Sequence, residues 1–294
     1  GQEQTVDLVL TAILANGHVL IEGVPGVAKT LLARLTARLI DADFSRVQFT
    51  PDLMPSDVLG TTVFNMKTNG FDFHQGPIFA DIVLVDEINR APAKTQAALF
   101  EVMEERQISI DGTTHRMGDL YTILATQNPV EQEGTYKLPE AQLDRFLMKI
   151  TMDYPSLEEE VNILERHHTN AALVKLDDIV PAITKEELLS LRAFMNQVFV
   201  DRTLLQYIAL IVQQTRTSKA VYLGASPRAS VAMLQSSKAY ALLQGRDFVT
   251  PEDIKFVAPY VLQHRLILTA EAEMEGYSPV KVTQRLIDKV EVPK

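Results

Sequence analysis

Residues 18–40 read HVLIEGVPGVAKTLLARLTARLI: a short apolar run, a loop with two glycines and a helix-prone segment. A strand that enters a helix through such a loop is the setting of a phosphate-binding loop. There, backbone N–H groups and the positive end of the following helix converge on an anion. This order of segments predicts an α/β fold with a nucleotide phosphate site at residues 23–30.

The loop offers side chains for phosphate and for Mg²⁺. Lys29 would neutralise charge on the β- and γ-phosphates, and Thr30 would bind Mg²⁺. The generic pattern GxxxxGK[ST] has glycine where this chain has Ala28. Alanine fits there at no cost if its backbone is helical, so we interpret the loop as a functional variant. The alternative is a turn before an ordinary helix.

A second motif is DIVLVDEINR, residues 81–90, in which an apolar run ends in two carboxylates. Ligands of open α/β sheets bind at the carboxyl ends of strands. We expect Asp86 to hold Mg²⁺, mostly through water, and Glu87 to polarise the water that attacks the γ-phosphate. The alternative is a solvated strand end. The predicted nucleotide-binding residues are Gly23, Val24, Pro25, Gly26, Val27, Ala28, Lys29, Thr30 and Asp86, with Thr30 and Asp86 as metal ligands.

Three further polar residues complete the predicted site. Asn128 ends the apolar run 121–128 and would lie beside Asp86, where its amide could orient water; alone it would be a turn former. Arg145 stands between apolar neighbours in LDRF, where a structural salt bridge is the alternative. Arg228 follows a capping Ser226 in the first turn of a helix, which disfavours cations. We therefore expect an anion near Arg228, either a phosphate or a nearby carboxylate.

The chain divides into two predicted domains. Apolar β-type runs alternate with helical patterns up to residue 155, which indicates an α/β domain at 1–155 with a mostly parallel central sheet. From 156 to 294, helix-capping signatures open one helix after another, which indicates an all-α domain. The β-type runs are 18–23, 46–50, 81–87, 121–128 and 148–155, and the capping signatures begin at residues 156, 184, 226 and 250.

Two insertions in the first domain are predicted hairpins. Residues 61–76 and 106–117 contain NG and DG pairs between β-prone arms, the residues that tight hairpin turns require. Most such tips are surface decoration.

Composition restricts the function further. The 294 residues include no cysteine, which excludes disulfides and a cysteine nucleophile and fits a reducing compartment, so we expect the cytoplasm. The net charge is −10, of which residues 1–155 carry −9 (12 basic, 21 acidic groups). A nucleic-acid binder would usually carry the opposite sign, so no nucleic-acid partner is expected. No apolar run is long enough to predict a membrane span.

Together these segments resemble the MoxR family of AAA+ ATPases, in GVPGVAKT, VDEINRAPAKTQAALFEVMEERQISIDG, ATQNPVEQEGTYKLPEAQLDRF and GASPRA. The resemblance implies an α/β ATPase domain with a helical lid, hexameric rings, ATP between subunits and a von Willebrand A-domain partner. It also implies that the two hairpins, the family's helix 2 insert and pre-sensor 1 hairpin, contact substrate or partner. By motif it places Lys29 and Thr30 in Walker A, Asp86 and Glu87 in Walker B, Asn128 at sensor 1, Arg145 at the arginine finger and Arg228 at sensor 2.

The favoured hypothesis is a motor that couples ATP hydrolysis to chaperone-like remodelling or maturation of another protein, such as metal or cofactor insertion. Its client is not identified by the sequence. The alternatives are a nucleic-acid AAA+ motor, a nucleotide-gated scaffold with little hydrolysis, and a small-molecule kinase. Intact Glu87 and Asn128 disfavour the scaffold, and a helical domain after residue 155 disfavours the kinase.

Overall fold

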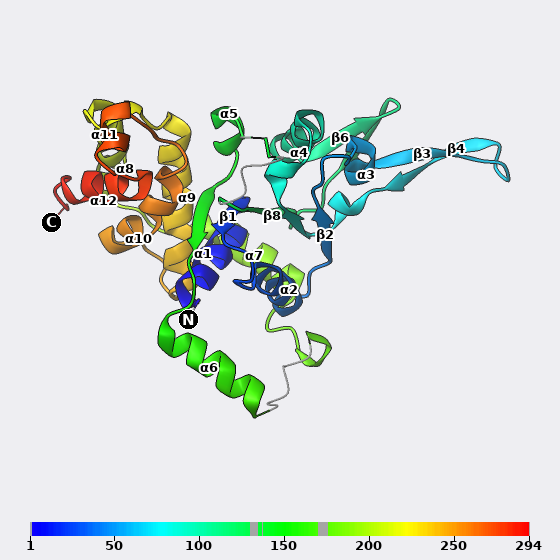
Figure 1. Ribbon diagram of the computed structural model, residues 1–294, viewed down its shortest axis with the longest axis horizontal. Helices are drawn as coiled ribbons and strands as arrows, with labels where there is room; N and C mark the ends of the chain where they lie inside the picture. Colours follow the sequence, from blue (N-terminus) through cyan, green and yellow to red (C-terminus); the bar gives the residue numbers. More distant parts are fainter. Residues whose placement is uncertain (1, 130–134, 137, 170–175, 294) are drawn as a thin grey trace. The chain divides into compact units, whose positions relative to one another are not determined.

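A computed structural model describes residues 2–129, 135–136, 138–169 and 176–293. Its central sheet has five strands in the order β2, β5, β8, β1, β9 (Figure 1). β5 pairs in parallel with both β2 and β8. This confirms the predicted parallel sheet, with one strand in each of the five predicted runs. The strands are β1 (Val19–Gly23), β2 (Phe44–Gln48), β5 (Ile82–Asp86), β8 (Thr122–Gln127) and β9 (Met148–Met152).

The centre of the sheet explains its apolar sequence. Every residue of β5 is buried, as are the first five residues of β8. A strand covered on both faces has no solvent side, so its apolar residues run continuously and do not alternate. Asp86 is buried too, but it is the one residue of β5 that is not apolar, and it stands at the end of the strand.

Both predicted hairpins are present and lie side by side (Figure 1). Asp111 and Gly112 have φ of 50° and 78°, the left-handed backbone that the predicted DG turn needs. Thr62 Oγ1 donates to Asp111 Oδ2 across 2.6 Å, which joins the first hairpin to the tip of the second. The hairpin strands are β3 (Gly60–Asn65), β4 (Gly70–Gln75), β6 (Gln107–Ile110) and β7 (Thr113–Arg116).

The second half is helical, as predicted, apart from the short strands β10 (Val221–Leu223) and β11 (Ile267–Leu268), which pair with each other. A short helix, α11, follows β11 directly. The helices are α1 (Glu3–Leu14), α2 (Lys29–Leu39), α3 (Pro55–Leu59), α4 (Ala93–Glu105), α5 (Glu140–Leu143), α6 (Leu157–His168), α7 (Lys185–Met195), α8 (Arg202–Thr217), α9 (Pro227–Leu243), α10 (Pro251–Leu262), α11 (Ala270–Met274) and α12 (Pro279–Asp288).

Three of the four predicted helix starts have a reciprocal cap. The caps pair Ser156 with Glu159, Thr184 with Glu187 and Thr250 with Asp253. Ser226 occupies the N-cap position of α9, as predicted, but its side chain makes no capping bond, and its buried hydroxyl has no hydrogen-bond partner in the described part of the chain. α9 still begins there, because Pro227 at the first helical position has a fixed φ suited to a helix start.

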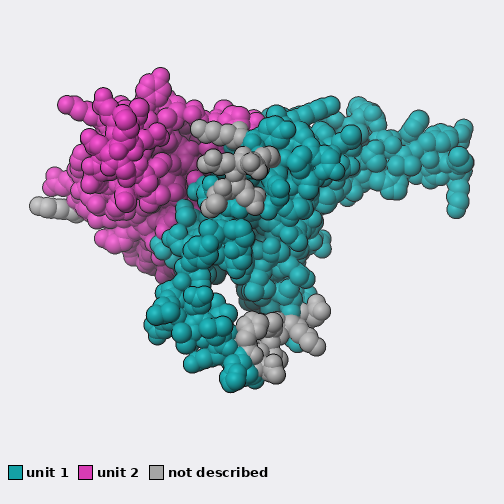
Figure 2. All heavy atoms as spheres, in the orientation of Figure 1, with its two compact units in different colours: residues 1–6, 20–138, 151–189 teal, residues 7–19, 139–150, 190–294 magenta. Residues whose placement is uncertain are grey.

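The chain forms two compact units (Figure 2). The first unit contains residues 1–6, 20–138 and 151–189, and the second contains residues 7–19, 139–150 and 190–294. The predicted domain boundary after residue 155 stays a prediction, since compactness groups residues 156–189 with the first unit. Among the described residues, no helix is both long and apolar enough to cross a membrane.

Candidate nucleotide site

The glycines of the phosphate loop are required by its backbone. β1 ends at Gly23, where a Cβ atom would lie 2.7 Å from the carbonyl oxygen of Met152 on β9. No side chain fits at that distance without moving a strand. Gly26 has φ of 88°, a left-handed conformation that glycine adopts without strain. The loop therefore has the close approach and the turn that its sequence predicted.

The expectation of a helical backbone at Ala28 is wrong. Ala28 has φ of 63° and ψ of 26°, which is left-handed, and it is the residue that caps the start of α2. The loop has to turn sharply to enter α2, and this residue makes the turn. A left-handed backbone costs an L-residue about 1–2 kcal/mol, so alanine is strained where the generic pattern has glycine.

Lys29 folds back over the loop. Its Nζ donates to the carbonyl oxygen of Gly23 across 2.6 Å. The ammonium group thus lies over the same loop whose amides are predicted to bind phosphate. Thr30 follows it in the first turn of α2 and is half-buried.

A cavity of about 410 Å³ opens beside this loop. Its lining includes Gly26 and Ala28 on one side and Glu159, Asn162 and Ile163 of α6 on the other. Cavities of about 300–1,000 Å³ are typical of small-molecule sites. α6, which sequence reasoning had assigned to the second domain, is therefore part of the wall of the candidate nucleotide site in the first unit.

Both carboxylate oxygens of Asp86 are hydrogen-bonded. Arg46 Nε donates to Oδ2 across 2.6 Å, and Thr126 Oγ1 donates to Oδ1 across 3.0 Å. Sequence reasoning missed both partners. A signal was present for Arg46, since it is a cation within a β-type run, but its partner depends on how the strands pair.

Glu87 is held by three groups. Its backbone is left-handed, with φ of 55°, and its N–H donates to Thr126 Oγ1 across 3.0 Å. Gln48 Nε2 and Arg90 Nη1 both donate to its Oε2, across 2.8 and 2.9 Å. The carboxylate therefore has a defined position at the end of β5, and Gln48 and Arg90 are further residues that the sequence reading did not single out.

Asn128 is buried just beyond the end of β8, at the same edge of the sheet. The residue directly across from Asp86, however, is a different one. Val85 pairs with Ala125, so the residue next to Asp86 is Thr126, whose hydroxyl contacts the carboxylate. Asn128 lies two residues further along the chain than Thr126. That its amide faces this edge of the sheet stays a prediction.

The two predicted arginines belong to the second unit. Arg145 lies in the turn between α5 and β9, and Arg228 is exposed in the first turn of α9. The ion pair of the LDRF motif is made by Asp144, whose Oδ1 accepts from Nε of the buried Arg265 across 2.6 Å. The motif therefore does contain a structural salt bridge, and the residue that forms it is Asp144, next to Arg145. The catalytic roles of Arg145 and Arg228 stay predictions.

Comparison with known proteins agrees with this geometry. The chain is 44% identical to the chaperone MoxR1 of Mycobacterium tuberculosis over its whole length and 79% of that relative. The chain belongs to the MoxR family of AAA+ ATPases. Residues 18–148 match the ATPase family associated with various cellular activities, and residues 213–288 match the AAA lid domain.

Two further proteins are similar to this chain over its whole length. The uncharacterized protein YeaC of Bacillus subtilis is 47% identical over all of this chain and 91% of its own. The crystal structure of a candidate ATPase from Cytophaga hutchinsonii superimposes with a TM-score of 0.91 at 41% identity, over all of this chain and 91% of that one. This MoxR-family protein is therefore an ATP hydrolase with a nucleotide-binding α/β domain and a lid.

Proposed function

We propose that this MoxR-family ATPase couples Mg-ATP hydrolysis to chaperone-like remodelling or maturation of partner proteins, including metal or cofactor insertion, as a hexameric ring. One observation carries the proposal: the unit that holds the phosphate loop also presents two joined hairpins with exposed aromatic side chains. The first feature supplies energy and the second supplies a surface for another protein.

Each residue of the nucleotide site has a proposed task. Lys29, already directed over the loop, neutralises phosphate charge. Glu87 polarises the attacking water and Asn128 orients it. Arg145 and Arg228 supply cations for the charge that develops on the γ-phosphate, Arg145 from a neighbouring subunit.

The residues present fit Mg²⁺. No group of three or more His, Asp or Glu side chains that could hold a metal occurs among the described residues. Mg²⁺ usually keeps several waters and takes one or two carboxylates plus substrate phosphates, which Asp86 and Thr30 can provide. Asp86 already faces a cation, Arg46, at 2.6 Å. When bound, Mg²⁺ would neutralise phosphate charge and orient the ATP.

The first hairpin offers an apolar surface for a partner. Phe64 and Phe71 are paired across the strands, with ring centroids 5.3 Å apart, and both are exposed. Phe73, on the same face, packs on His115 of the second hairpin with centroids 4.2 Å apart. The second hairpin thus covers this face near its base and leaves the outer pair uncovered. Exposed aromatic pairs are typical of protein-interaction surfaces.

The test replaces the pair and compares it with the opposite face. Phe64→Ser/Phe71→Ser should retain basal ATP hydrolysis but lose binding to the von Willebrand A-domain protein expected as partner. Val63→Ser is the matched control, because Val63 is exposed on the other face of the same strand. Equal partner binding by both variants would refute the role of this surface.

A nucleic-acid motor remains the second candidate only if polynucleotides act on the enzyme. The charge of −9 over residues 1–155 disfavours it. Stimulation of ATP hydrolysis by single- or double-stranded DNA at physiological salt would favour it over protein remodelling.

A further inference from the structure

Helix α6 has two faces of different character. Glu159, Asn162 and Ile163 line the cavity beside the phosphate loop. About half a turn away, at roughly 100° per residue, lie Leu157, Val161 and Leu164, which are 81%, 45% and 65% exposed. One face of α6 thus belongs to the nucleotide site, and the opposite face is an apolar stripe in solvent.

Acidic residues flank this stripe. Glu158 and Glu165 lie on one side of it and Glu160 on the other, and none of the three forms an ion pair within the described part of the chain. A partner for the stripe must therefore be apolar at its centre and positive at its rim. A second copy of α6 does not qualify, because two such faces would bring carboxylates against carboxylates.

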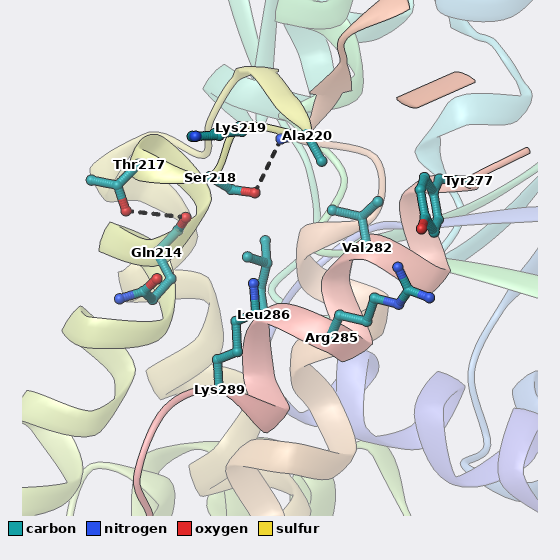
Figure 3. A pocket seen from close by; sticks show the side chains of 10 residues that line it. All are labelled: Gln214, Thr217, Ser218, Lys219, Ala220, Tyr277, Val282, Arg285, Leu286 and Lys289. Atoms are coloured by element: carbon teal, nitrogen blue, oxygen red, sulfur yellow. Dashed lines mark hydrogen bonds between the residues drawn. The ribbon is translucent and has the colours of Figure 1, made fainter. Parts of the chain in front are cut away.

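The second unit has a surface of the required kind. A pocket of about 420 Å³ lies between the end of α8 and α12, with Lys219, Arg285 and Lys289 among its lining (Figure 3). Val282 and Leu286 provide its apolar part, and none of the described residues that line it carries a carboxylate. Lys289 reaches from the end of α12 toward the end of α8 in Figure 3.

The helix dipole explains the lysines of this pocket but not its cavity or its apolar residues. Cations near helix C-termini are favourable with the helix dipole, which suits Lys219 after α8 and Lys289 after α12. That effect needs no cavity and no apolar floor. Arg285 is moreover held over the ring of Tyr277, its Cζ 4.4 Å from the centroid. A stacked guanidinium keeps its edge free for a carboxylate.

The pocket lies at the same end of the second unit as Arg228. Arg216 Nε, near the end of α8, donates to the carbonyl oxygen of Ala225 across 2.9 Å, and Ala225 N–H donates to Thr215 Oγ1 across 3.0 Å. These bonds hold the start of α9 against the end of α8. The basic pocket and the first turn of α9 therefore belong to one contiguous end of the second unit.

We propose that the outer face of α6 in one copy docks into the basic pocket of the next copy. The inference rests on the ring of the proposed function and names the contact that closes it. Two different surfaces meet, so the interface is heterologous, the type that generates rings. Because the inner face of α6 lines the cavity, each nucleotide site is then backed by a subunit contact.

The test uses charge reversal on either side of the contact. Glu158→Lys/Glu160→Lys changes the helix, and Lys219→Glu/Lys289→Glu changes the pocket. Each variant alone should need at least about tenfold more protein to assemble in sedimentation with ATP, because like charges meet at every interface. Matched controls are Lys281→Glu, exposed on α12 but outside the pocket, and Glu101→Lys, exposed on α4.

Mixing the two variants tests whether the helix of one copy meets the pocket of another copy. In an alternating ring each reversed helix meets a reversed pocket and each native helix meets a native pocket. The mixture should therefore assemble within about twofold of the native protein. A contact within one chain could not be repaired by mixing.

Three results would overturn the inference, and they differ in whether they also exclude the proposed function. Rings that form equally well from every variant would exclude this contact and leave the proposed function intact. A native protein that stays monomeric with ATP at every concentration would exclude both. Loss of assembly in each variant without recovery on mixing would also exclude the contact.

Discussion

Arg46 on β2 donates from Nε to Oδ2 of Asp86 at the end of β5, across 2.6 Å. The arginine side chain is 51% exposed and the aspartate 10%, so the pair lies at the mouth of the site. On the proposed assignment, Asp86 is the carboxylate that holds Mg²⁺. The guanidinium and the metal ion therefore compete for one carboxylate.

Arg46→Gln should lower the Mg²⁺ concentration for half-maximal ATP hydrolysis by about two- to fivefold, the equivalent of an exposed ion pair. Phosphate release against free Mg²⁺ at saturating ATP measures it. Arg34→Gln, exposed on α2, is the control for loss of a cation. A higher Mg²⁺ requirement would mean that Arg46 assists metal binding.

Lys29→Ala should lose ATP affinity, whereas Glu87→Gln should bind ATP normally and hydrolyse it poorly. Lys29 acts on ground-state phosphate charge, while Glu87 acts only on the attacking water. Nucleotide titration combined with phosphate release separates the two effects. Equal loss of ATP affinity in both variants would refute the role of Glu87.

Ala28→Gly should raise the free energy of unfolding by about 0.5–1 kcal/mol, since relief of left-handed strain exceeds the entropy cost of glycine. Chemical denaturation measures it. The control is Ala97→Gly in the exposed interior of α4, where a helical backbone should make glycine destabilising by about 1 kcal/mol. Destabilisation at both positions would show that residue 28 is not strained.

Burial and the neighbouring charge of Arg265 hold the pKa of His264 well below its ordinary value of 6.5. The folded protein keeps this histidine neutral, while the unfolded chain takes up a proton below about pH 6.5. The stability contribution is therefore complete above that pH and is lost on acidification toward the folded pKa, at up to about 1.4 kcal/mol per pH unit.

His264→Gln should reduce this loss of stability between pH 6.5 and pH 5, because glutamine takes up no proton in that range. Glutamine can still donate to the carbonyl oxygen of Phe146, which His264 Nε2 contacts at 3.0 Å, so the packing should be kept. Denaturation series at several pH values measure the slope, with His74→Gln on β4 as the control for loss of a histidine. An unchanged slope would contradict the assignment to His264.

Arg145→Ala should bind ATP but hydrolyse it about 10³-fold more slowly or worse, if the residue acts as a finger. Mixed with Lys29→Ala, which has an intact finger and an inactive loop, it should regain activity that rises with protein concentration. Co-assembly is confirmed by sedimentation. An inactive mixture of co-assembled copies would mean that Arg145 acts within its own subunit or only structurally.

The sequence by itself determined the elements that depend on local physics. A strand buried on both faces must be apolar throughout, so residues 82–85 identified the centre of the sheet. Tight hairpin turns need left-handed residues, so the DG pair at 111–112 located a turn. Glycine, lysine and threonine at the spacing of a phosphate loop predicted a nucleotide site at residues 23–30, and the left-handed backbone of Gly26 fits such a loop.

Only the tertiary structure decided which side chains meet. Arg46 and Thr126 are each 40 residues from Asp86 in the chain, and the pairing of parallel strands brings both to its carboxylate. The left-handed backbone of Ala28 and the position of α6 at the nucleotide cavity also escaped the sequence reading. These features depend on how distant segments pack, and the spacing of residues along one strand or helix contains no information about what lies across from it.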